Sequence, residues 1–285
     1  MRNKENKKKS NKKIWLILYG ILVIACLVCI GGFVLFLLDD DAGESQKQYE
    51  LVAEKVVIPD IVIPEFVPEG DKAELPVDFE ALQEMNPEIY AWIQIPDTRV
   101  DYPVLQHESE DQSYYLTRDM YGDASKAGSI YTEYYNKKDF YDPNTIIYGH
   151  NMKNGSMFHD LRYFAQEDFF AEHEDLYIYT PSSILRYKIF ASYEYDDRHL
   201  LATYDFYDEE VYQSYIEEIM NPRSMYTMLR EEYEIRPGNC IVTLSTCVAN
   251  KPNSRRLVQA VLVDELPAEY KGEVNGENNE ETETE

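Results

Sequence analysis

The chain has 285 residues, of which 53 are Asp or Glu and 27 are Lys or Arg, so its formal net charge is −26 at pH 7. This length accommodates one sizeable domain with appendages. The acidic balance argues against nucleic-acid binding, because contacts to phosphates need a basic face. We interpret the acidic surface as a means of solubility and mutual repulsion rather than as a recruiting surface.

The N-terminal end has the pattern of a membrane anchor. Residues 1–13 carry seven Lys or Arg and one acid, whereas residues 14–38 carry no charged side chain. As a helix, this uncharged stretch would be ~37 Å long, enough to span a ~30 Å hydrocarbon core. A cleaved signal peptide is the alternative, but its apolar stretch would be shorter and would end at small residues, whereas Leu38 is followed directly by Asp39. We predict a cytoplasmic segment (1–13), one transmembrane helix (14–38) and an extracellular remainder, hence a single-pass protein of the cell membrane.

Residues 39–75 are predicted to be an extracellular stalk. Their first part is polar, and Pro59, Pro64 and Pro68 then interrupt an apolar stretch. Proline at this spacing prevents helix formation and favours an extended, semi-rigid chain. The alternative is a segment that folds back on the domain through its Val and Ile side chains. At the other end, residues 268–285 are rich in Glu and poor in apolar residues, so we predict an acidic, disordered tail.

The segment 76–267 is predicted to form one mainly β domain. Asp78 is a candidate N-cap of a short helix that ends before Pro87. Two further helical intervals interrupt a series of short strands bounded by turn residues, which favours a mainly antiparallel barrel or sandwich with peripheral helices. We expect strands at 92–95, 100–104, 128–132, 145–148, 176–179, 185–190, 241–247 and 257–263, and helices at 78–85, 156–173 and 208–230.

The placement of the cysteines identifies one candidate reactive thiol. Cys26 and Cys29 lie in the predicted membrane segment and are interpreted as small apolar residues. Cys240 and Cys247 lie on one predicted strand about 23 Å apart, which is too far for a disulfide, whose Cα atoms lie within about 7 Å of each other. An unpaired Cys247 at the end of a strand is a candidate nucleophile, since a thiolate attacks carbonyl carbon readily. The alternative is a buried, apolar cysteine.

His150 is the candidate acid or base. It follows an apolar strand and Gly149, a residue that lets the backbone turn sharply. Imidazole exchanges protons near neutral pH, which acyl transfer from a thiol requires. A purely structural role is the alternative for a lone histidine. His159 falls in a predicted helix, whereas His173 and His199 stand among acids and are interpreted as solvated.

Arg256 is the candidate anion-stabilising residue. Its guanidinium stays protonated, so it is suited only to binding an anion such as the oxygen of a tetrahedral acyl intermediate. Arg255 precedes it, and adjacent residues on a strand point to opposite faces, so only one of the two faces Cys247. We assign the role to Arg256, with Arg255 as the alternative for another strand register. A pair of solvent-facing basic residues is the structural alternative.

Two separated motifs resemble those of the sortase family. The residues T-L-S-T-C at 243–247, with Arg256 at the start of the next strand, resemble the sortase signature T-L-x-T-C…R. The segment 147–158, I-Y-G-H-N-M-K-N-G-S-M-F, is similar to the histidine segment of class B sortases. The resemblance covers roughly residues 78–266 and is supported by Tyr115-Leu116, by A-G-S-I at 127–130 and by the predicted helix at 208–230.

The resemblance implies an eight-stranded β-barrel transpeptidase on the outer face of Gram-positive membranes. Such an enzyme cleaves a sorting pentapeptide near the C-terminus of an exported protein, after Thr, and holds the acyl group as a Cys thioester. An amine of the peptidoglycan cross-bridge then resolves the thioester. The implied partners are therefore exported proteins with a sorting signal, a peptidoglycan amine and the cell membrane.

The same resemblance implies a role for individual residues. Cys247 would be the nucleophile, His150 the acid/base, and Arg256 the residue that holds the substrate carbonyl and its oxyanion. Val248 is a departure, because many relatives carry an acid directly after the cysteine, and this bears on substrate preference rather than on the reaction. The implied substrate groove runs along Leu116, Tyr148, Ser245 and Thr246.

Two other functions remain open from the sequence. A pilin-polymerising sortase would form the same thioester but use a pilin lysine as acceptor, and these motifs do not distinguish the acceptors. A non-catalytic, tyrosine-rich surface protein would carry an unreactive, buried Cys247. No cofactor is expected, and no metal either, because no His/Cys cluster has the spacing of a zinc site.

Overall fold

The computed structural model describes residues 19–30, 43–58, 61–109, 111–221 and 227–272. The chain divides into two compact units, residues 1–44 and residues 45–285, which are described separately. In the first unit, residues 19–30 form a helix. Across the described ranges, no helix is both long enough and apolar enough to cross a membrane. The rest of the predicted transmembrane helix and the basic segment 1–13 lie outside the described residues.

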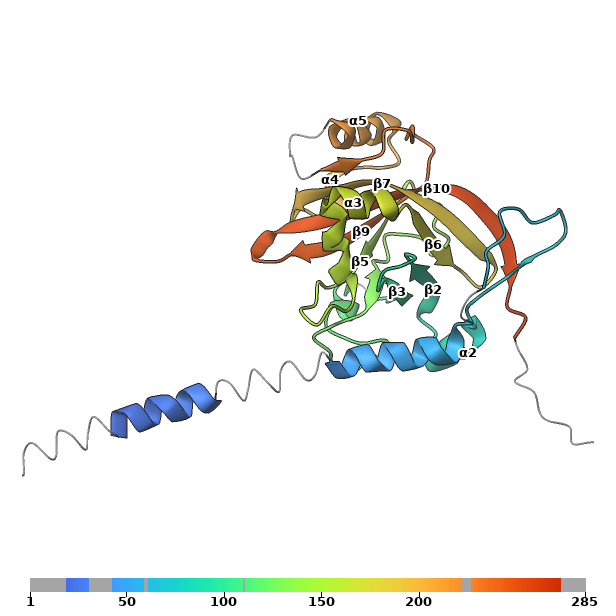
Figure 1. Cartoon of the computed structure of the whole chain (residues 1–285). Helices are drawn as coiled ribbons and strands as arrows, with labels where there is room; N and C mark the ends of the chain where they lie inside the picture. The colour runs from blue at the N-terminus through green and yellow to red at the C-terminus, as the bar shows by residue number, and fades with distance from the viewer. Residues whose placement is uncertain (1–18, 31–42, 59–60, 110, 222–226, 273–285) are drawn as a thin grey trace, which may run out of the picture. The chain divides into compact units, whose positions relative to one another are not determined.

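The second unit is built on one sheet that closes on itself (Figure 1). Its strand order is β1-β10-β9-β5-β4-β3-β2-β6-β7-β8, and additional pairing of β10 with β7 closes the eight strands from β10 to β7 into a barrel. The predicted eight-stranded barrel is thereby confirmed. The strands are β1 (Ala73–Glu74), β2 (Ile89–Gln94), β3 (Asp101–Gln106), β4 (Ile130–Thr132), β5 (Asn144–Tyr148), β6 (Asp175–Tyr179), β7 (Ser183–Asp196), β8 (Met228–Leu229), β9 (Ile241–Val248) and β10 (Lys251–Glu269).

Two apolar clusters hold the barrel together. One lines the inside of the barrel with side chains such as Leu244 and Val258 and extends to helical side chains such as Phe79 and Leu82. The other lies on the outside of β7, β9 and β10 and joins them to helical side chains such as Tyr215 and Ile216. These strands are buried on both faces, so their sequences read as nearly continuous apolar runs. Each fully buried large side chain contributes about 1.5–3 kcal/mol.

The helices cover the outside of the barrel. Asp78 caps the first, since its side chain accepts a hydrogen bond from the Ala81 N–H, as predicted. The predicted helix 156–173 is two shorter pieces, and the predicted helix 208–230 ends at Met220, with Met228–Leu229 forming a short strand on β7. The helices are α2 (Phe79–Met85), η1 (Tyr114–Leu116), η2 (Phe158–Ala165), α3 (Glu167–Glu172), α4 (Leu200–Thr203) and α5 (Glu209–Met220).

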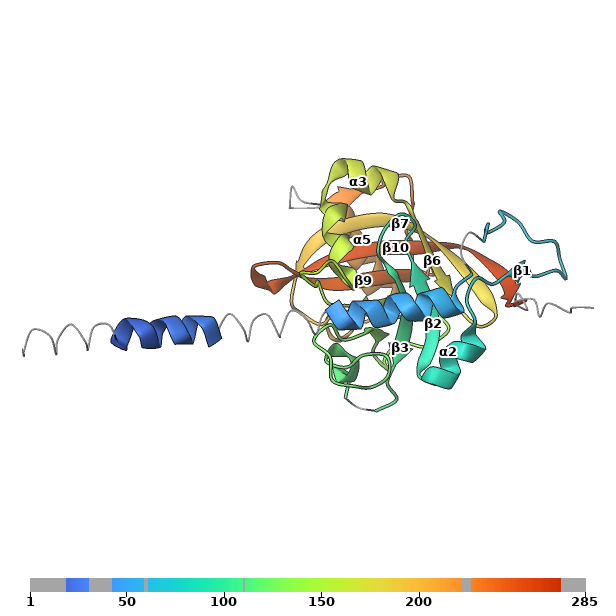
Figure 2. The same ribbon diagram turned by 60° about the horizontal axis from the view of Figure 1, so that its bottom comes forward.

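The predicted stalk is in part a folded element. Residues 43–56 form a helix, and its apolar side chains Tyr49, Val52 and Val56 are buried against the domain at helical spacing. This helix lies alongside β2, β3 and α2 (Figure 2). The prolines that suggested an extended spacer all follow it in the chain, so the alternative of a segment folding back describes residues 45–57 better.

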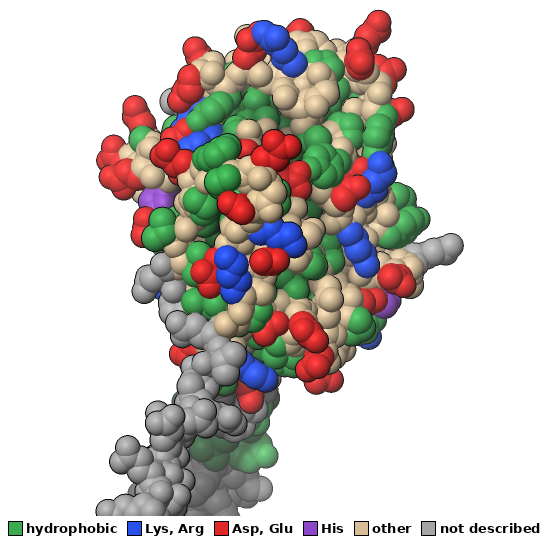
Figure 3. Space-filling view, turned by 90° about the vertical axis from the view of Figure 1, so that its right-hand side faces the viewer, with side chains coloured by type: hydrophobic (Ala, Val, Ile, Leu, Met, Phe, Trp, Pro, Cys, Tyr) green, Lys and Arg blue, Asp and Glu red, His purple; other side chains and the backbone are tan. Residues whose placement is uncertain are grey.

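The boundaries of the domain are also wider than predicted. β1 pairs in parallel with the end of β10, Ala73 lying opposite Ala268. Residues 268 and 269 therefore belong to the sheet and not to the acidic tail, and residues 273–285 lie outside the described residues. On the face shown in Figure 3, acidic side chains are interspersed with basic ones around apolar groups.

Candidate active site

Two parallel strands bring the histidine segment to the cysteine. β5 pairs in parallel with β9, with Tyr148 opposite Ser245, so both strands end at the same edge of the sheet. Beyond this pair, the Gly149 N–H donates to the Ser245 carbonyl at 3.2 Å. The Asn151 side-chain amide then donates to the Cys247 carbonyl at 2.9 Å. Cys247 and the segment that carries His150 are therefore held side by side by main-chain and side-chain hydrogen bonds.

Cys247 is free and exposed. It lies one residue before the end of β9, and the strand places its side chain on the face opposite to that of the buried Thr246. The alternative of a buried, apolar cysteine is therefore wrong. An accessible thiol at a strand end is open to attack a peptide carbonyl.

His150 is half-buried, and its ring is held by one hydrogen bond. Its Nε2 lies 2.8 Å from the Leu116 carbonyl oxygen. A carbonyl oxygen only accepts, so Nε2 carries the proton and Nδ1 is left for proton exchange. The backbone is fixed as well, because the Phe158 N–H donates to the His150 carbonyl at 2.9 Å.

Gly149 is required for a reason that the sequence did not reveal. A Cβ at this position would lie 2.5 Å from Ile130 Cδ1 and 2.7 Å from Phe158 Cδ2. The residue before His150 is thus a point of close packing between β4 and η2, whereas a sharp turn was expected from the sequence. Any larger side chain would push the histidine segment away from the barrel.

Strand register corrects the prediction for the arginine. Arg255 lies directly opposite Cys247 on β9, and Arg256 lies opposite Thr246. Residues directly opposite in an antiparallel pair share a face, so Arg255 is the arginine on the side of the thiol. The pairing is irregular between Lys251 and Arg255, and this irregularity decides which of the two arginines shares the face of Cys247.

The two neighbouring arginines have different surroundings. Arg256 is 5% exposed, its Nη2 lies 3.2 Å from Glu194 Oε1, and burial lowers its pKa while Glu194 opposes that change. Arg255 is half-buried and its Nη1 donates to the Pro252 and Ser254 carbonyls of its own hairpin. The predicted position of Arg256 beside the thiol is thus replaced by Arg255.

The packing of β9 and β10 supports the same assignment of faces. Leu244 and Val258 belong to the cluster inside the barrel. Ile241 and Leu257 belong to the cluster outside it, under α5. Side chains alternate along a strand, so Cys247 and Arg255 lie on the outer face and Thr246 and Arg256 on the inner face.

The predicted groove residues divide in the same way. Ser245 shares the outer face with Cys247, and Tyr148 lies opposite it and is half-buried. Leu116 is 38% exposed and offers its carbonyl to His150. Thr246 is 2% exposed on the inner face, which does not fit the expected position in a groove.

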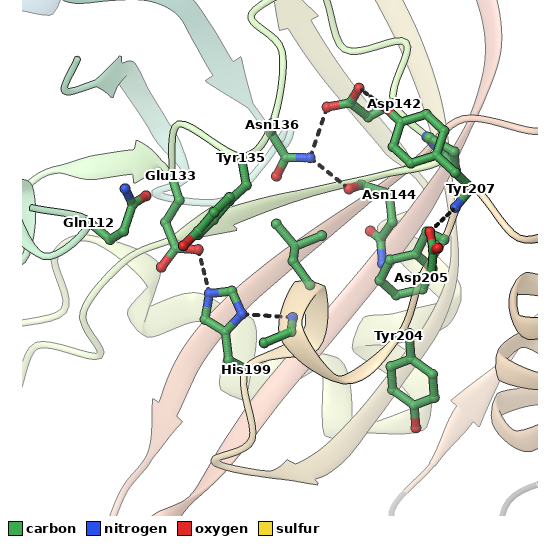
Figure 4. Close-up of a pocket in the computed structure, with 14 residues that line it drawn as sticks. Gln112, Glu133, Tyr135, Asn136, Asp142, Asn144, His199, Tyr204, Asp205 and Tyr207 are labelled. Atoms are coloured by element: carbon green, nitrogen blue, oxygen red, sulfur yellow. Dashed lines mark hydrogen bonds and ion pairs between the residues drawn. The ribbon is translucent and has the colours of Figure 1, made fainter. Parts of the chain in front are cut away.

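A pocket of about 620 Å³ lies between the β4–β5 segment and the α4 region (Figure 4). In it, His199 Nε2 lies 2.5 Å from Glu133 Oε2, and this hydrogen bond raises the pKa of His199. The hydroxyl of Tyr148 also donates to Glu133, at 3.4 Å. Burial, followed by the charge of Glu133, raises the pKa of Tyr148. Glu133 therefore lines the pocket and also contacts Tyr148, a residue of the candidate site.

Sequence reasoning missed this pair of residues. His199 was interpreted as solvated, but it is half-buried, and its Nδ1 also accepts from the Ala202 N–H to cap α4. Glu133 stands 66 positions away in the chain, and no local pattern links the two. Among the described residues, no group of three or more His, Cys, Asp or Glu side chains could hold a metal ion.

Fold and site together define a class of protein: a β-barrel enzyme that transfers acyl groups through an exposed thiol. A family model described as the sortase domain matches residues 93–263. Sortase B of Listeria monocytogenes is 36% identical over 184 residues, covering 64% of this chain and 72% of the relative. Sortase B of Staphylococcus aureus is 26% identical over 181 residues, covering 63% and 72%.

Solved structures agree with this match. Sortase B from B. anthracis has a TM-score of 0.63 and 32% identity, covering 79% of this chain and 98% of that one. A sortase B–substrate complex from Staphylococcus aureus has a TM-score of 0.60 at 21% identity and supports the fold alone. The chain belongs to the sortase family, and its relatives place it in class B. It is a sortase-type cysteine transpeptidase.

Proposed function

We propose that this protein is a membrane-anchored transpeptidase that cleaves the C-terminal sorting signal of exported proteins and transfers the acyl group to a peptidoglycan amine. The observation that carries the proposal is the exposed Cys247 with Arg255 opposite it and the His150 segment hydrogen-bonded beside it. These three side chains supply a nucleophile, an anion-stabilising cation and a proton carrier. No further cofactor is needed for this reaction.

In the first half of the reaction, the sulfur of Cys247 attacks the carbonyl carbon of the scissile peptide bond. The developing oxyanion lies on the face of Arg255, whose permanent charge stabilises it. The proton of the Cys247 thiol passes to Nδ1 of His150 as the sulfur attacks, and Nδ1 transfers this proton to the leaving amine when the C–N bond breaks. The thioester remains on Cys247.

In the second half, the incoming amine attacks the thioester carbonyl. His150 takes the proton that the amine loses, and Cys247 leaves as thiolate when the new amide bond forms. Nε2 stays on the Leu116 carbonyl through both halves, so a single ring atom handles the moving proton. Because Nε2 keeps its hydrogen bond while Nδ1 exchanges the proton, His150 is suited to act first as an acid and then as a base.

The outer face beside Cys247 is the proposed binding surface for the sorting signal. Ser245 and Tyr148 lie along it, and the exposed side chain of Leu116 borders it. The pocket at Glu133 and His199 extends the same side of the barrel under α4. A peptide in extended conformation has backbone groups to pair with strand edges and side chains to fill such a pocket.

Anchoring in the membrane is proposed from composition. The uncharged segment 14–38 between the basic residues 1–13 and the acids that follow fits one membrane-spanning helix with a cytoplasmic N-terminus. Fractionation of cells with the full chain and with a chain that starts at residue 43 tests this. Recovery of both in the soluble fraction would contradict it.

The reaction is tested with the domain from residue 43 onward, a set of sorting-signal peptides and amine acceptors. We expect a thioester adduct on Cys247 by mass spectrometry and its loss in Cys247→Ala. Cys240→Ala is a matched control, because Cys240 is also free of disulfides but lies directly before β9, at the opposite end of the strand from Cys247. The mass of the product separates transfer to a peptidoglycan amine from transfer to a pilin lysine. An adduct that persists without Cys247 overturns the proposal.

A further inference from the structure

The helix 43–56 makes polar as well as apolar contacts with the domain. Ser45 Oγ lies 3.0 Å from Ser125 Oγ, Gln46 accepts a hydrogen bond from Tyr102 of β3, and Tyr49 reaches the loop that carries Gly128. Tyr49 is only 3% exposed, and its hydroxyl is buried with its partners. These contacts connect the helix to His150 by two routes.

The first route ends on the imidazole ring. The Tyr49 hydroxyl donates to the Gly128 carbonyl at 3.2 Å and lies 3.1 Å from Ser129 Oγ. Gly128 packs directly against the Leu116 carbonyl group, since a Cβ at position 128 would lie 2.6 Å from its oxygen. That oxygen is the acceptor for His150 Nε2. A displacement of Tyr49 would therefore displace the peptide group of Gly128 and then that of Leu116, whose carbonyl holds the His150 ring.

The second route ends on the backbone of the same residue. The ring of Tyr49 packs edge-on against Tyr102, with centroids 5.5 Å apart. The Tyr102 hydroxyl donates to Gln46 Oε1 at 3.2 Å and accepts from the Met157 N–H at 2.9 Å. The next residue, Phe158, donates its N–H to the His150 carbonyl. Both the ring and the main chain of His150 are thus held from the same helix.

We propose that helix 43–56 is a positioning element for His150 and that Tyr49 is its positioning residue. The inference rests on the proposed role of His150 as proton carrier. Tyr49 touches neither substrate nor thiol in this scheme, and it acts by keeping the Leu116 carbonyl where it selects the Nε2–H tautomer. A loosened Leu116 carbonyl lets the proton move to Nδ1, which leaves the wrong nitrogen free for the reaction.

The test is Tyr49→Phe in the chain from residue 43, with Tyr212→Phe as a matched control. Tyr212 is 1% exposed, and its hydroxyl donates to the Asn239 carbonyl at 3.2 Å, so the control removes a hydrogen-bonded hydroxyl from a similarly buried tyrosine of α5. We expect Tyr49→Phe to lower kcat about tenfold with KM within about twofold, because positioning rather than binding is lost. Imidazole nitrogen chemical shifts of His150 should change from one tautomer to a mixture. Tyr212→Phe should leave both readouts unchanged.

Two results would overturn the inference. One is an unchanged tautomer and kcat in Tyr49→Phe, and the other is an equal fall in kcat in both variants without a tautomer change, which marks a loss of stability alone. If Tyr49→Phe does not fold, Gln46→Ala on the second route takes its place with the same readouts. The spectroscopic readout needs no activity, so failure here is distinct from failure of the proposed function, which a fully active His150→Gln variant would reveal.

A double-mutant cycle examines the first route by itself. Ser129 Oγ lies against the Tyr49 hydroxyl and donates to the Arg118 carbonyl. If both side chains act through the same link, the loss of kcat in Tyr49→Phe combined with Ser129→Ala will not exceed the larger single loss. Fully multiplicative losses would show that the two residues act independently and would exclude a shared link through the Tyr49 hydroxyl.

Discussion

The outer and inner faces of β9 and β10 carry similar residues in very different settings. On the outer face, Cys247 is exposed and Arg255 donates hydrogen bonds to carbonyl groups of its own hairpin. On the inner face, Thr246 is buried and Arg256 is buried against Glu194. One arginine is thus available to a substrate, and its neighbour is committed to the fold. The comparison teaches that the position of a charge along the chain says little until the register of its strand is known.

The sharpest test of this comparison is Arg255→Met. Removing the cation on the face of the thiol should lower kcat by about 10²- to 10³-fold if Arg255 is the oxyanion-stabilising donor that we propose. The melting temperature should hardly change, because Arg255 is half-buried and its hydrogen bonds go to carbonyl groups of its own hairpin. Steady-state kinetics and thermal denaturation of the same preparation measure both. A fully active variant would remove Arg255 from the mechanism.

The matching change on the inner face is Arg256→Met. It removes a buried hydrogen bond to a carboxylate and should lower the free energy of unfolding by about 2 kcal/mol. Lys251 still pairs with Glu194 at 2.6 Å, which limits the loss. Activity per folded molecule should be retained. If instead catalysis collapses at unchanged stability, the original assignment from the sequence was right and the comparison of faces fails.

A smaller effect is expected for Asn151→Ala. This substitution removes the hydrogen bond that ties the histidine segment to the Cys247 carbonyl at 2.9 Å. The loss of one such bond is worth about 1 kcal/mol, or roughly a fivefold fall in kcat/KM. Asn154→Ala in the same loop serves as a control for general loop effects. An equal fall in both variants would argue that the loop, and not this bond, matters.

The smallest effect concerns the pH dependence of stability at the pocket. The hydrogen bond to Glu133 raises the pKa of His199. A group with a raised pKa in the folded state stabilises fully below its unfolded pKa, about 6.5 for histidine, and this contribution is lost as the pH rises through the folded pKa. The gap in melting temperature between the wild type and Glu133→Gln should therefore be wider at pH 6 than at pH 8. Equal gaps would contradict the ion pair.

Much of the barrel and the exposed position of Cys247 could be predicted because their signals are local. The run 241–247 is apolar and ends in the thiol, so strand, motif and exposure follow from consecutive residues. The register that places Arg255 rather than Arg256 opposite Cys247 could not be predicted, because the pairing is irregular between Lys251 and Arg255 and no pattern in that loop indicates the irregularity. Long-range partners such as Glu133 and His199 have no local signal at all.

The helix 43–56 was missed for a different reason. Its pattern was present, since Tyr49, Val52 and Val56 recur at helical spacing. The prolines downstream dominated the interpretation of the whole segment, although proline restricts only its own surroundings. Treating the polar first part and the proline-containing second part separately would have recovered the helix.

The buried side chains of this helix also matter for producing the enzyme. A recombinant fragment cut at residue 76 would strip Tyr49, Val52 and Val56 from the barrel and leave the end of β10 without β1. The exposed apolar surface and the bare strand edge would invite self-association. Low yield or aggregates from such a fragment would then reflect a misplaced truncation and say nothing about catalysis.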